Sequence, residues 1–539
     1  MALSAPLLLS LAVVGCISLY NAVLWLLSTR RPQNYPPGPR TLLGLGNIHQ
    51  IPLSLPFLKY DAWAKEYGPI VGLKLGPNNM VILNDASLIY EHIVKRGQHF
   101  SARPPRYIAQ EHILPDARNT YSLFMRNDYS RRLRTITKQF LVGAGLFKLA
   151  PMQKAAGTRL IYNLFQSSDD WMEHIMQWGV STPVTMLSGA PVEEFGEHWI
   201  HDYHYSQGLM EELVDPASAP PVDIFPILRW VPSIFAEWKR KAPLTRKALL
   251  YAYGVMMNQA KKARHGSFQS LIPKLLEQSV DPSTAPDGRF TEQEIKLMMG
   301  GMLYSPSAEQ NGSDAAVDSS VVTFQIILLA LAAHPEAQRK AQLEIDAVFQ
   351  SDTALPDTID LDELPYLNAC VTEALRWRPV SPLGLPREVI DDEIVLGYRI
   401  PKGSTVVLNQ WTIQQDPEFY EDPDRYMPER FIQDQFGAKK GISQLGRKTL
   451  YTFGAGRREC PGKDFFFQNM RLAFAQILWA FDIVPTEPLH VDINKGFTSS
   501  VVLRPKPFKV KFVPRRANFG DVLLEEKLKA DLKLKEILA

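Results

Sequence analysis

The first 29 residues of the chain contain no charged side chain, and this constrains the fold more than any other feature of the sequence. The segment from Pro6 to Leu27 is almost wholly apolar, and about 20 apolar residues are enough for a helix to cross a membrane. Arg30 and Arg31 follow directly, which favours the cytosolic side for the rest of the chain. A cleaved signal peptide is the alternative, but the segment lacks a basic start and an evident cleavage site. We therefore expect residues 1–29 to form a transmembrane anchor.

A proline-rich segment follows the anchor. The sequence NYPPGPR at residues 34–40 fixes several φ angles and removes backbone donors, so it predicts a stiff, extended connector. We place a hinge at residues 30–40, a main body at 41–515 and a charged tail at 516–539. The charge-interleaved leucines of the tail predict a short amphipathic helix.

Composition excludes some classes of function for the body. The chain of 539 residues is 45% hydrophobic and 22% charged, with a net charge of +2, so nothing indicates nucleic acid as a partner. Its three cysteines are too few and too scattered for a disulfide framework: Cys16, Cys370 and Cys460. This scarcity is typical of a protein whose body faces the cytosol.

Helical patterns dominate the body. Residues 365–378 place apolar side chains at the three-and-four spacing of one helix face, and Val321–Ala333 is apolar nearly all round, which predicts a buried helix. Turn residues divide β-branched runs at Ile70–Asp85 and at Ile394–Leu408, which predicts strands there. The expected fold class is therefore mainly α with small β-sheets.

The segment YTFGAGRRECPGKDF, residues 451–465, gives Cys460 an unusual setting. A free cysteine is most often a small buried apolar residue. Here, however, nearby glycines would let the backbone approach something large and flat, and Arg457 and Arg458 would favour a thiolate over a thiol. A nucleophilic cysteine would need a histidine base, and zinc would need further ligands at short spacing; neither is near in the sequence. A single thiolate suits haem iron, because the porphyrin supplies four other donors.

The same segment resembles the haem-binding signature of the cytochrome P450 family, Phe-x-x-Gly-x-Arg-x-Cys-x-Gly. The matching residues are Phe453, Gly456, Arg458, Cys460 and Gly462. Other segments resemble family motifs in the expected order: PPGP after the anchor, FSARP at 100–104, EALR at 373–376, PLGLPREV at 382–389 and PERF at 428–431. The resemblance covers about residues 30–515 and is strongest to the fungal, membrane-bound branch.

The resemblance implies a cytochrome P450 fold and roles for individual residues. Cys460 would be the axial ligand of the haem iron, in haem b, within the cofactor-binding segment just listed. Arg458, Arg387 and Arg134 would bind the haem propionates, although Arg132 is an alternative to Arg134, and the usual tryptophan before this arginine is missing. The resemblance makes Glu373, Arg376 and Arg430 a structural cluster rather than catalytic residues.

The proton-delivery motif of the family, Ala/Gly-Gly-x-Asp/Glu-Thr-Thr, is matched less closely. Counting back from His334 aligns it with AAVDSS, residues 315–320, so the resemblance assigns O2 activation to Asp318 and Ser319. Serine replaces threonine and still offers a hydroxyl. Alanine stands at position 316 where the family has glycine.

Residues 305–314, just upstream, look like an insertion in the helix that carries this motif. They include the helix breakers Pro306 and Gly312. The sequence GSD at 312–314 offers a competing register for the motif.

The resemblance implies a monooxygenase that inserts one oxygen atom of O2 into a lipophilic small molecule, by hydroxylation or epoxidation, in fungal secondary metabolism. Electrons would come from NADPH through a separate reductase, which Arg457 and Lys463 would face, at the endoplasmic reticulum membrane. Substrate contacts are expected from four segments: 108–124, 203–214, 380–385 and 496–500. Two alternatives stay open: a haem-thiolate isomerase or dehydratase that needs no reductase, and a haem-binding relative without catalysis.

Overall fold

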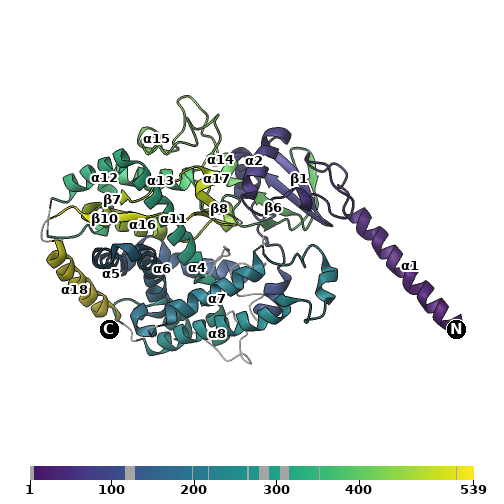
Figure 1. Ribbon diagram of the computed structural model, residues 1–539, viewed down its shortest axis with the longest axis horizontal. Coiled ribbons are helices and arrows are strands. Elements are labelled where there is room, and N and C mark those ends of the chain that lie inside the picture. Colours follow the sequence, from purple (N-terminus) through teal and green to yellow (C-terminus); the bar gives the residue numbers. More distant parts are fainter. Residues whose placement is uncertain are drawn as a thin grey trace.

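The structure, a computed structural model, describes residues 5–115, 128–196, 198–215, 218–263, 266–277, 290–303, 315–350, 353–499, 501–516 and 519–539. It is mostly helical, as expected, with small sheets: β1 (Ile70–Leu75) and β6 (Thr405–Leu408) lie at the end of the body next to α1 (Ala5–Ser28), and β7 (Phe481–Pro485) and β10 (Val510–Pro514) lie toward the opposite end (Figure 1). The helices of the body are α2 (Pro56–Tyr67), α3 (Ala86–Leu88), α4 (Asp128–Leu141), α5 (Ala144–Gln166), α6 (Trp171–Ser188), α7 (Trp199–Val214), α8 (Glu237–Lys262), α9 (Leu271–Glu277), α10 (Glu292–Leu303), α11 (Ala315–Ala333), α12 (Pro335–Val348), α13 (Pro365–Trp377), α14 (Gln410–Gln414), α15 (Glu429–Gln433), α16 (Lys463–Ala480), α17 (Ile493–Gly496) and α18 (Phe519–Leu538).

The largest sheet among the described residues has the strand order β1-β2-β6-β3. Strands β1 (Ile70–Leu75) and β2 (Asn78–Leu83) form an antiparallel hairpin, β6 (Thr405–Leu408) runs parallel to β2, and β3 (Arg387–Glu388) is antiparallel to β6. Three antiparallel pairs complete the sheets: β4 (Glu393–Val395) with β5 (Tyr398–Ile400), β7 (Phe481–Pro485) with β10 (Val510–Pro514), and β8 (Phe497–Ser499) with β9 (Leu503–Pro505). The strands expected at residues 394–408 thus belong to two different sheets, because β4 and β5 pair with each other while β6 joins the largest sheet.

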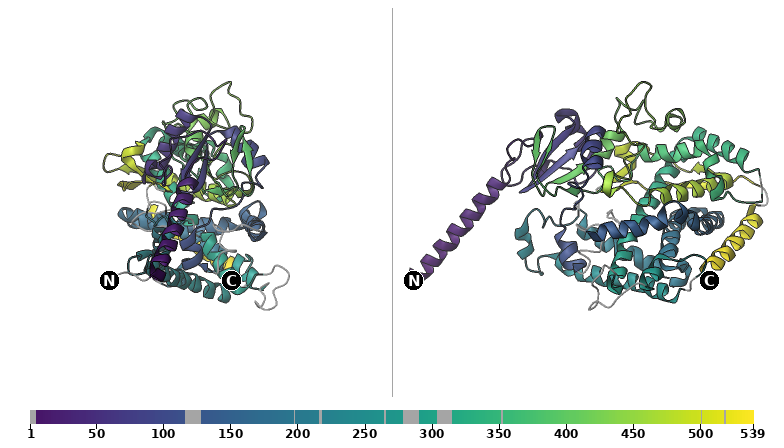
Figure 2. Two further views of the ribbon diagram at one scale, coloured as in Figure 1. Left: turned by 90° about the vertical axis from the view of Figure 1, so that its right-hand side faces the viewer. Right: turned by 180° about the vertical axis from the view of Figure 1, so that it is seen from behind.

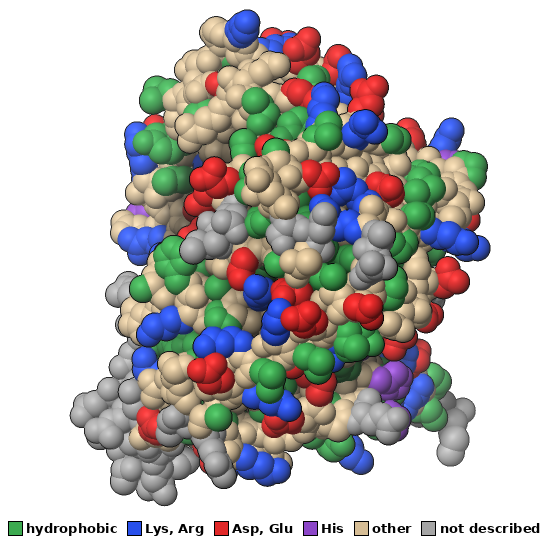
Figure 3. Space-filling model, turned by 90° about the vertical axis from the view of Figure 1, so that its left-hand side faces the viewer, with side chains coloured by type: hydrophobic (Ala, Val, Ile, Leu, Met, Phe, Trp, Pro, Cys, Tyr) green, Lys and Arg blue, Asp and Glu red, His purple; other side chains and the backbone are tan. Residues whose placement is uncertain are grey.

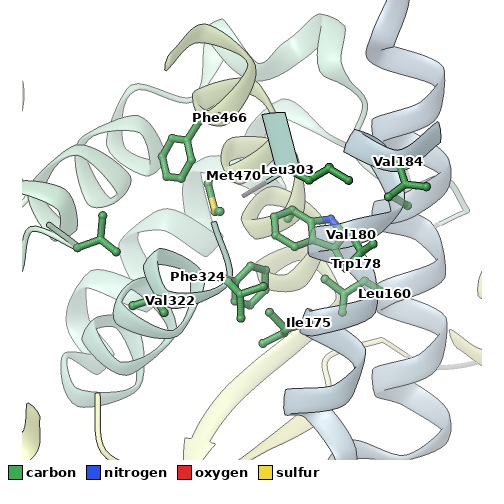
Figure 4. Close-up of a cluster of buried hydrophobic side chains, with 14 of the residues drawn as sticks. Leu160, Ile175, Trp178, Val180, Val184, Leu303, Val322, Phe324, Phe466 and Met470 are labelled. Atoms are coloured by element: carbon green, nitrogen blue, oxygen red, sulfur yellow. The ribbon is translucent and has the colours of Figure 1, made fainter. Parts of the chain in front are cut away.

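Helix α11 forms the centre of the helical core. Its side chains are buried from Val321 to Ala332, which confirms the buried helix expected there. The Phe324 ring lies 5.1 Å from Trp178 of α6 and 4.6 Å from Phe474 of α16, measured between ring centroids. Figure 4 shows Phe324 and Trp178 among apolar side chains of α5, α6, α10, α11 and α16. Such dense apolar packing holds α11 in one position, which fixes the residues that it carries.

Helix α1 (Ala5–Ser28) projects away from the body, beside the β1–β2 sheet (Figures 1 and 2). Its segment Leu11–Ser28 is long and apolar enough to cross a membrane, and none of that segment is buried in the protein. The length and composition match the expected anchor.

The segment after α1 is fastened to the sheet by Arg31. Its guanidinium donates hydrogen bonds of 2.5–3.1 Å to four carbonyl oxygens, those of Pro36, Gly38, Pro39 and Gly72. Gly72 belongs to β1, so the proline-rich segment and the strand share one donor group. The sequence indicated only that Arg31 orients the chain in a membrane. In the structure, Arg31 also holds the proline-rich segment against β1.

The carboxylate of Glu373 joins α13 to the segment that leads into α15. It accepts hydrogen bonds from Arg376 at 2.7 and 2.8 Å, from Arg430 at 3.1 Å and from the Met427 backbone at 2.9 Å. Glu373, Arg376 and Arg430 are all buried. A buried carboxylate with two buried guanidinium groups holds its partners firmly, because removing one of them leaves charge without compensation.

Helix α18 covers α5, although the two are far apart in the sequence. Its apolar face is buried, and Asp531 accepts hydrogen bonds of 2.6 and 3.2 Å from the Arg159 guanidinium of α5. On the face of the protein that includes α18, acidic and basic side chains are interspersed (Figure 3). The expected amphipathic helix is therefore present, and its apolar side packs against α5 of the same chain.

We expect Glu373→Gln to lower the free energy of unfolding by about 3–5 kcal/mol, because the neutral amide leaves two buried guanidinium groups without counter-charge. Urea unfolding of the purified full-length protein, followed by circular dichroism, measures this. The control Glu525→Gln, in an exposed pair with Lys529, should change the midpoint little. Equal midpoints for the two variants would contradict the role given to Glu373.

Candidate functional site

The backbone around Cys460 forms a closed loop ahead of α16. The Cys460 amide donates to the Phe453 carbonyl at 2.8 Å, and the Glu459 amide donates to the Gly456 carbonyl at 3.0 Å. Lys448 supports the loop from outside by donating to the Gly454 carbonyl at 2.8 Å and pairing with Glu459 at 2.6 Å. The loop leaves Cys460 exposed, three residues before the first residue of α16.

The helix start beside Cys460 favours a negative charge on its sulfur. The first backbone N–H groups of a helix have no partner within it, so they carry a partial positive charge. Cys370 offers a contrast, because it is fully buried in α13 and burial raises the pKa of its thiol. Of the two cysteines in the body, Cys460 therefore has the setting of a thiolate ligand.

The glycines of the loop serve different purposes. Gly456 has a φ of +61°, and a Cβ placed on it would lie 2.1 Å from the carbonyl oxygen of Ile93. Ile93 belongs to the short π-helix η2 (Ile89–Lys95), so glycine is required here for packing of backbone on backbone. A Cβ on Gly462 would instead lie 3.9 Å from the Cys460 sulfur. Both glycines were expected to bind the cofactor, and no sequence pattern indicates η2 as the neighbour of Gly456.

Gln414 of α14 connects the Cys460 loop to the Glu373 cluster. Its side-chain oxygen accepts from the amides of Tyr451 at 2.7 Å and Thr452 at 3.0 Å, at the start of the loop segment. Its backbone carbonyl accepts from Arg376 at 2.9 Å. Gln414 is fully buried, and the sequence analysis missed it because no local pattern distinguishes this glutamine.

Two of the arginines expected to bind propionates lie beside the loop. Arg387 is buried in β3 and donates to the Ala455 carbonyl at 2.6 Å, while Arg458 donates through Nε to the Ser101 carbonyl at 2.8 Å. A Cβ on Gly454 would lie 3.8 Å from Nη2 of Arg387, so this part of the loop backbone lies close to the guanidinium. Both guanidinium groups are therefore held by backbone oxygens at the edge of the loop.

Arg103 is a further residue of this region that the sequence analysis did not single out, although its motif FSARP was noted. It donates to the carbonyls of Leu385 at 2.9 Å and Pro386 at 2.7 Å, directly before Arg387. Ala102 pairs with Glu388 in a β-bridge. Arg103 and Leu385, which are 282 positions apart in the sequence, thus bring the two motifs together next to Arg387 of β3.

For the remaining expected site residues, the structure describes the backbone but not every side chain. Arg132 and Arg134 belong to α4 and Asp318 belongs to α11, but their side chains lie outside the described part of the structure, as does the segment 305–314. Ser319 is half-buried on α11, and its carbonyl accepts a hydrogen bond from the Thr323 hydroxyl at 2.5 Å. The register of α11 thus places Ser319 one turn before the buried Thr323.

Two of the segments expected to contact a substrate are joined by hydrogen bonds and by a buried arginine. The Leu503 amide of β9 donates to Val380 at 2.8 Å, and Arg378 donates to Val491, ahead of β8, at 2.9 Å. Arg378 also lies over the ring of Trp377, with 4.2 Å from its guanidinium carbon to the centroid. Because Leu503 pairs with Ser499 in the β8–β9 hairpin, segment 380–385 is linked to residues 496–499 through β9.

The residues around Cys460 fit an iron porphyrin. An exposed sulfur in a fixed loop can serve as one axial ligand, and Arg387 and Arg458 are suited to the two carboxylates that such a macrocycle carries. The described residues contain no group of three or more His, Cys, Asp or Glu side chains suited to a metal ion held by protein ligands alone. A metal bound through Cys460 would therefore need most of its donors from a cofactor.

Comparison with known proteins agrees with this chemistry. The family model for cytochrome P450 matches residues 36–512. The chain is 31% identical over 516 residues to the cytochrome P450 monooxygenase grgG of Penicillium, covering 91% of this chain and 89% of that protein. It is also 31% identical over 493 residues to a cytochrome P450 monooxygenase of Armillaria gallica, covering 90% of each. A zebrafish cytochrome P450 solved with progesterone matches in fold, with a TM-score of 0.67 at 21% identity over 85% of this chain and 99% of that one.

The site, the fold and these relatives lead to one conclusion. The chain belongs to the cytochrome P450 family, and it is a monooxygenase of the oxidoreductase class.

Proposed function

We propose that this protein inserts one oxygen atom of O2 into a lipophilic small molecule, by hydroxylation or epoxidation, with electrons delivered from NADPH by a separate reductase. The observation that carries the proposal is the exposed sulfur of Cys460 in a hydrogen-bonded loop at the start of α16. When bound, the haem supplies the activation of O2 and the transfer of its oxygen atom. The protein supplies the thiolate, the orientation of the cofactor, and the protons.

Cys460 would hold the iron, and three arginines would orient the macrocycle. Arg387 and Arg458 are each anchored to a backbone carbonyl and would bind the propionates, with Arg134 as the third donor. Phe453 packs against Phe466 and Phe467, with ring centroids 5.4 and 5.5 Å apart. This aromatic cluster would hold Phe453 in place, and the Phe453 carbonyl accepts the hydrogen bond of the Cys460 amide.

Asp318 and Ser319 would pass protons toward the site of O2 binding. The Ser319 hydroxyl can both accept and donate a proton, which a relay requires. Its position is supported by the tight packing of α11, in which every residue from Val321 to Ala332 is buried. A serine moves more freely about χ1 than the threonine usual in the family, so the relay would depend on that packing.

A redox partner would approach the side of the loop that carries Arg457 and Lys463. Arg457 is exposed and Lys463 is half-buried at the first position of α16. Two cations near the cysteine suit an acidic partner surface, because opposite charges steer association.

We further propose that α1 anchors the enzyme in the endoplasmic reticulum membrane, with the body in the cytosol. A second apolar surface supports this: Ile227, Trp230, Ile234 and Phe235, between α7 and α8, are all more than 70% exposed. Lys239 donates to the carbonyls of Arg229 and Val231, so the loop is held in place while these side chains remain outside. An exposed apolar patch near an apolar helix suits a lipid surface.

The relatives favour a role in fungal secondary metabolism. Monooxygenases of Penicillium, Armillaria and Aspergillus align along about 90% of this chain. A fungal enzyme with an apolar anchor would meet substrates that partition into membranes.

Reduced protein treated with carbon monoxide should show the long-wavelength Soret band of thiolate ligation, and Cys460→Ala should abolish that band, because alanine has no ligand atom. Cys16→Ala, in α1, is the matched control and should keep it. The band in the Cys460 variant, or its absence from folded, haem-loaded wild-type protein, would overturn the proposal. Product formation without NADPH and reductase would favour a rearrangement instead.

Ser319→Ala should raise the hydrogen peroxide released per NADPH consumed at least about twofold, because a lost proton donor favours unproductive release of reduced oxygen. Ser319→Thr should restore low peroxide release. The matched control is Ser320→Ala, one position along α11, for which we expect a smaller change. Peroxide assays during reductase-supported turnover measure all three, and equal values for the two alanine variants would refute the assignment.

Deletion of residues 1–28 should release the protein from the alkaline-resistant membrane fraction. Peripheral binding that remains should fall when Trp230 and Phe235 are both replaced by alanine, since both side chains are more than 75% exposed. Flotation with phosphatidylcholine vesicles measures this. Leu445→Ala, on another part of the surface, is the control for loss of an exposed apolar side chain. An unchanged membrane fraction after the deletion would contradict the anchor.

A further inference from the structure

Helix α18 carries leucines on two faces, and only one of these faces packs against the body. The inner face includes Leu523 and Leu534, which are buried. On the outer face, Leu524, Leu528 and Leu532 follow one another at intervals of four residues and are 44%, 53% and 67% exposed. Residues four apart lie on the same side of a helix, so these three leucines form one apolar stripe, here called the leucine stripe.

A charged side chain stands at each end of the leucine stripe, three residues beyond its last leucine: Asp521 before it and Lys535 after it. Both residues are exposed. Every other charged side chain of α18 forms an ion pair, either within the helix or with Arg159 of α5. Within the part of the chain that the structure describes, Asp521 and Lys535 form none. The two charges that flank the stripe therefore remain for a partner outside the chain.

The spacing of these five residues reads the same in both directions along the helix. From Asp521 to Lys535 the intervals are three, four, four and three residues, with Leu528 at the centre. A second copy of α18, laid antiparallel across the stripe with a two-fold axis at Leu528, would place Leu524 opposite Leu532 and each end charge opposite its counter-charge. Such self-complementarity is what a two-fold interface between identical chains requires.

The charge of α18 favours a second copy of the chain over a lipid surface. The helix has four lysines and five acidic side chains, whereas helices that lie on anionic membranes carry an excess of basic residues. Figures 1 and 2 also show α18 at the end of the body opposite α1. Pairing through α18 would therefore leave the apolar helix α1 outside the contact.

We propose that α18 is a homodimerisation surface: two copies of the chain pair antiparallel through their leucine stripes, with Asp521 of each copy opposite Lys535 of the other. The inference is independent of the proposed chemistry, because α18 lies beyond residues 36–512, which the family model matches. One pair of short helices buries less than the area of about 1,200 Å² at which specific interfaces become stable. The dimer should therefore be weak and should form as the protein concentration rises.

Disulfide cross-linking tests the register of the pair. The full-length holoenzyme, in a Cys16→Ala background and at one copy per phosphatidylcholine nanodisc, is oxidised with copper phenanthroline. Leu528→Cys should link to a second copy of itself, because this position lies on the two-fold axis. Leu524→Cys and Leu532→Cys should each stay largely monomeric alone. An equal mixture of these two variants should give at least about fivefold more linked dimer than either alone, since a disulfide needs closely opposed positions.

Exchange of the end charges tests their pairing. Asp521→Lys or Lys535→Asp alone puts like charges together at both ends of the dimer, so each should raise the dimer dissociation constant about three- to tenfold. The double variant restores opposite charges and should return to within about twofold of the wild-type value. Sedimentation of the nanodisc samples over a series of concentrations measures these constants.

Lys533→Asp is the matched control, because it makes the same change two positions away, at a lysine whose partner Glu536 lies in the same helix. Its dissociation constant should equal that of the wild type, and circular dichroism checks that all variants keep their helix content. A wild-type protein that stays monomeric at every concentration would overturn the inference, as would a double variant no stronger than the single ones. In microsomes, a cross-link from Leu528→Cys only to a protein of different mass would also overturn it, and would assign the stripe to another partner.

Discussion

The carboxylate of Glu373 is the interaction on which the rest of the site depends. It accepts hydrogen bonds from two buried guanidinium groups and one backbone amide. One of these guanidinium groups, that of Arg376, also donates to the Gln414 carbonyl. Gln414 in turn fixes the backbone where the cysteine loop begins. A charged group without contact to the site therefore determines where the Cys460 sulfur lies. Burial makes this arrangement costly to break, because each guanidinium would lose its counter-charge in a region that water does not reach.

The sequence was sufficient to predict the fold class and the cysteine segment, and the reasons are local. The helix at 321–333 is apolar nearly all round, and the hairpin of β1 and β2 has turn residues between β-branched runs, so each pattern reflects short-range physics. The roles of Gly456, Gln414 and Arg103 could not be predicted in this way. Each role is defined by a partner in another part of the chain, such as Ile93 for Gly456. No spacing within one segment encodes such a partner.

Arg31 shows how a correct local interpretation can be incomplete. Placed after an apolar helix, it predicts membrane orientation, and that expectation depends only on charge. In the structure its guanidinium also donates to the carbonyl oxygens of Pro36, Gly38 and Pro39, in a segment whose prolines have no N–H of their own to donate. The proline-rich segment is therefore fixed to β1 as well as intrinsically stiff. Together with the hydrogen bond from the Trp25 indole to the Gly44 carbonyl, this gives the apolar helix a defined direction relative to the sheet.

The packing of α18 on α5 has a consequence for the synthesis of the protein. Arg159 of α5 and Asp531 of α18 are separated by 372 positions, yet they form an ion pair. The apolar faces of the two helices pack together next to this pair. During translation α5 emerges long before its cover exists, so its apolar face stays open to other molecules until residues 519–538 have been made. Ribosome-associated chaperones would therefore be expected to occupy α5 during that interval and to leave once α18 docks.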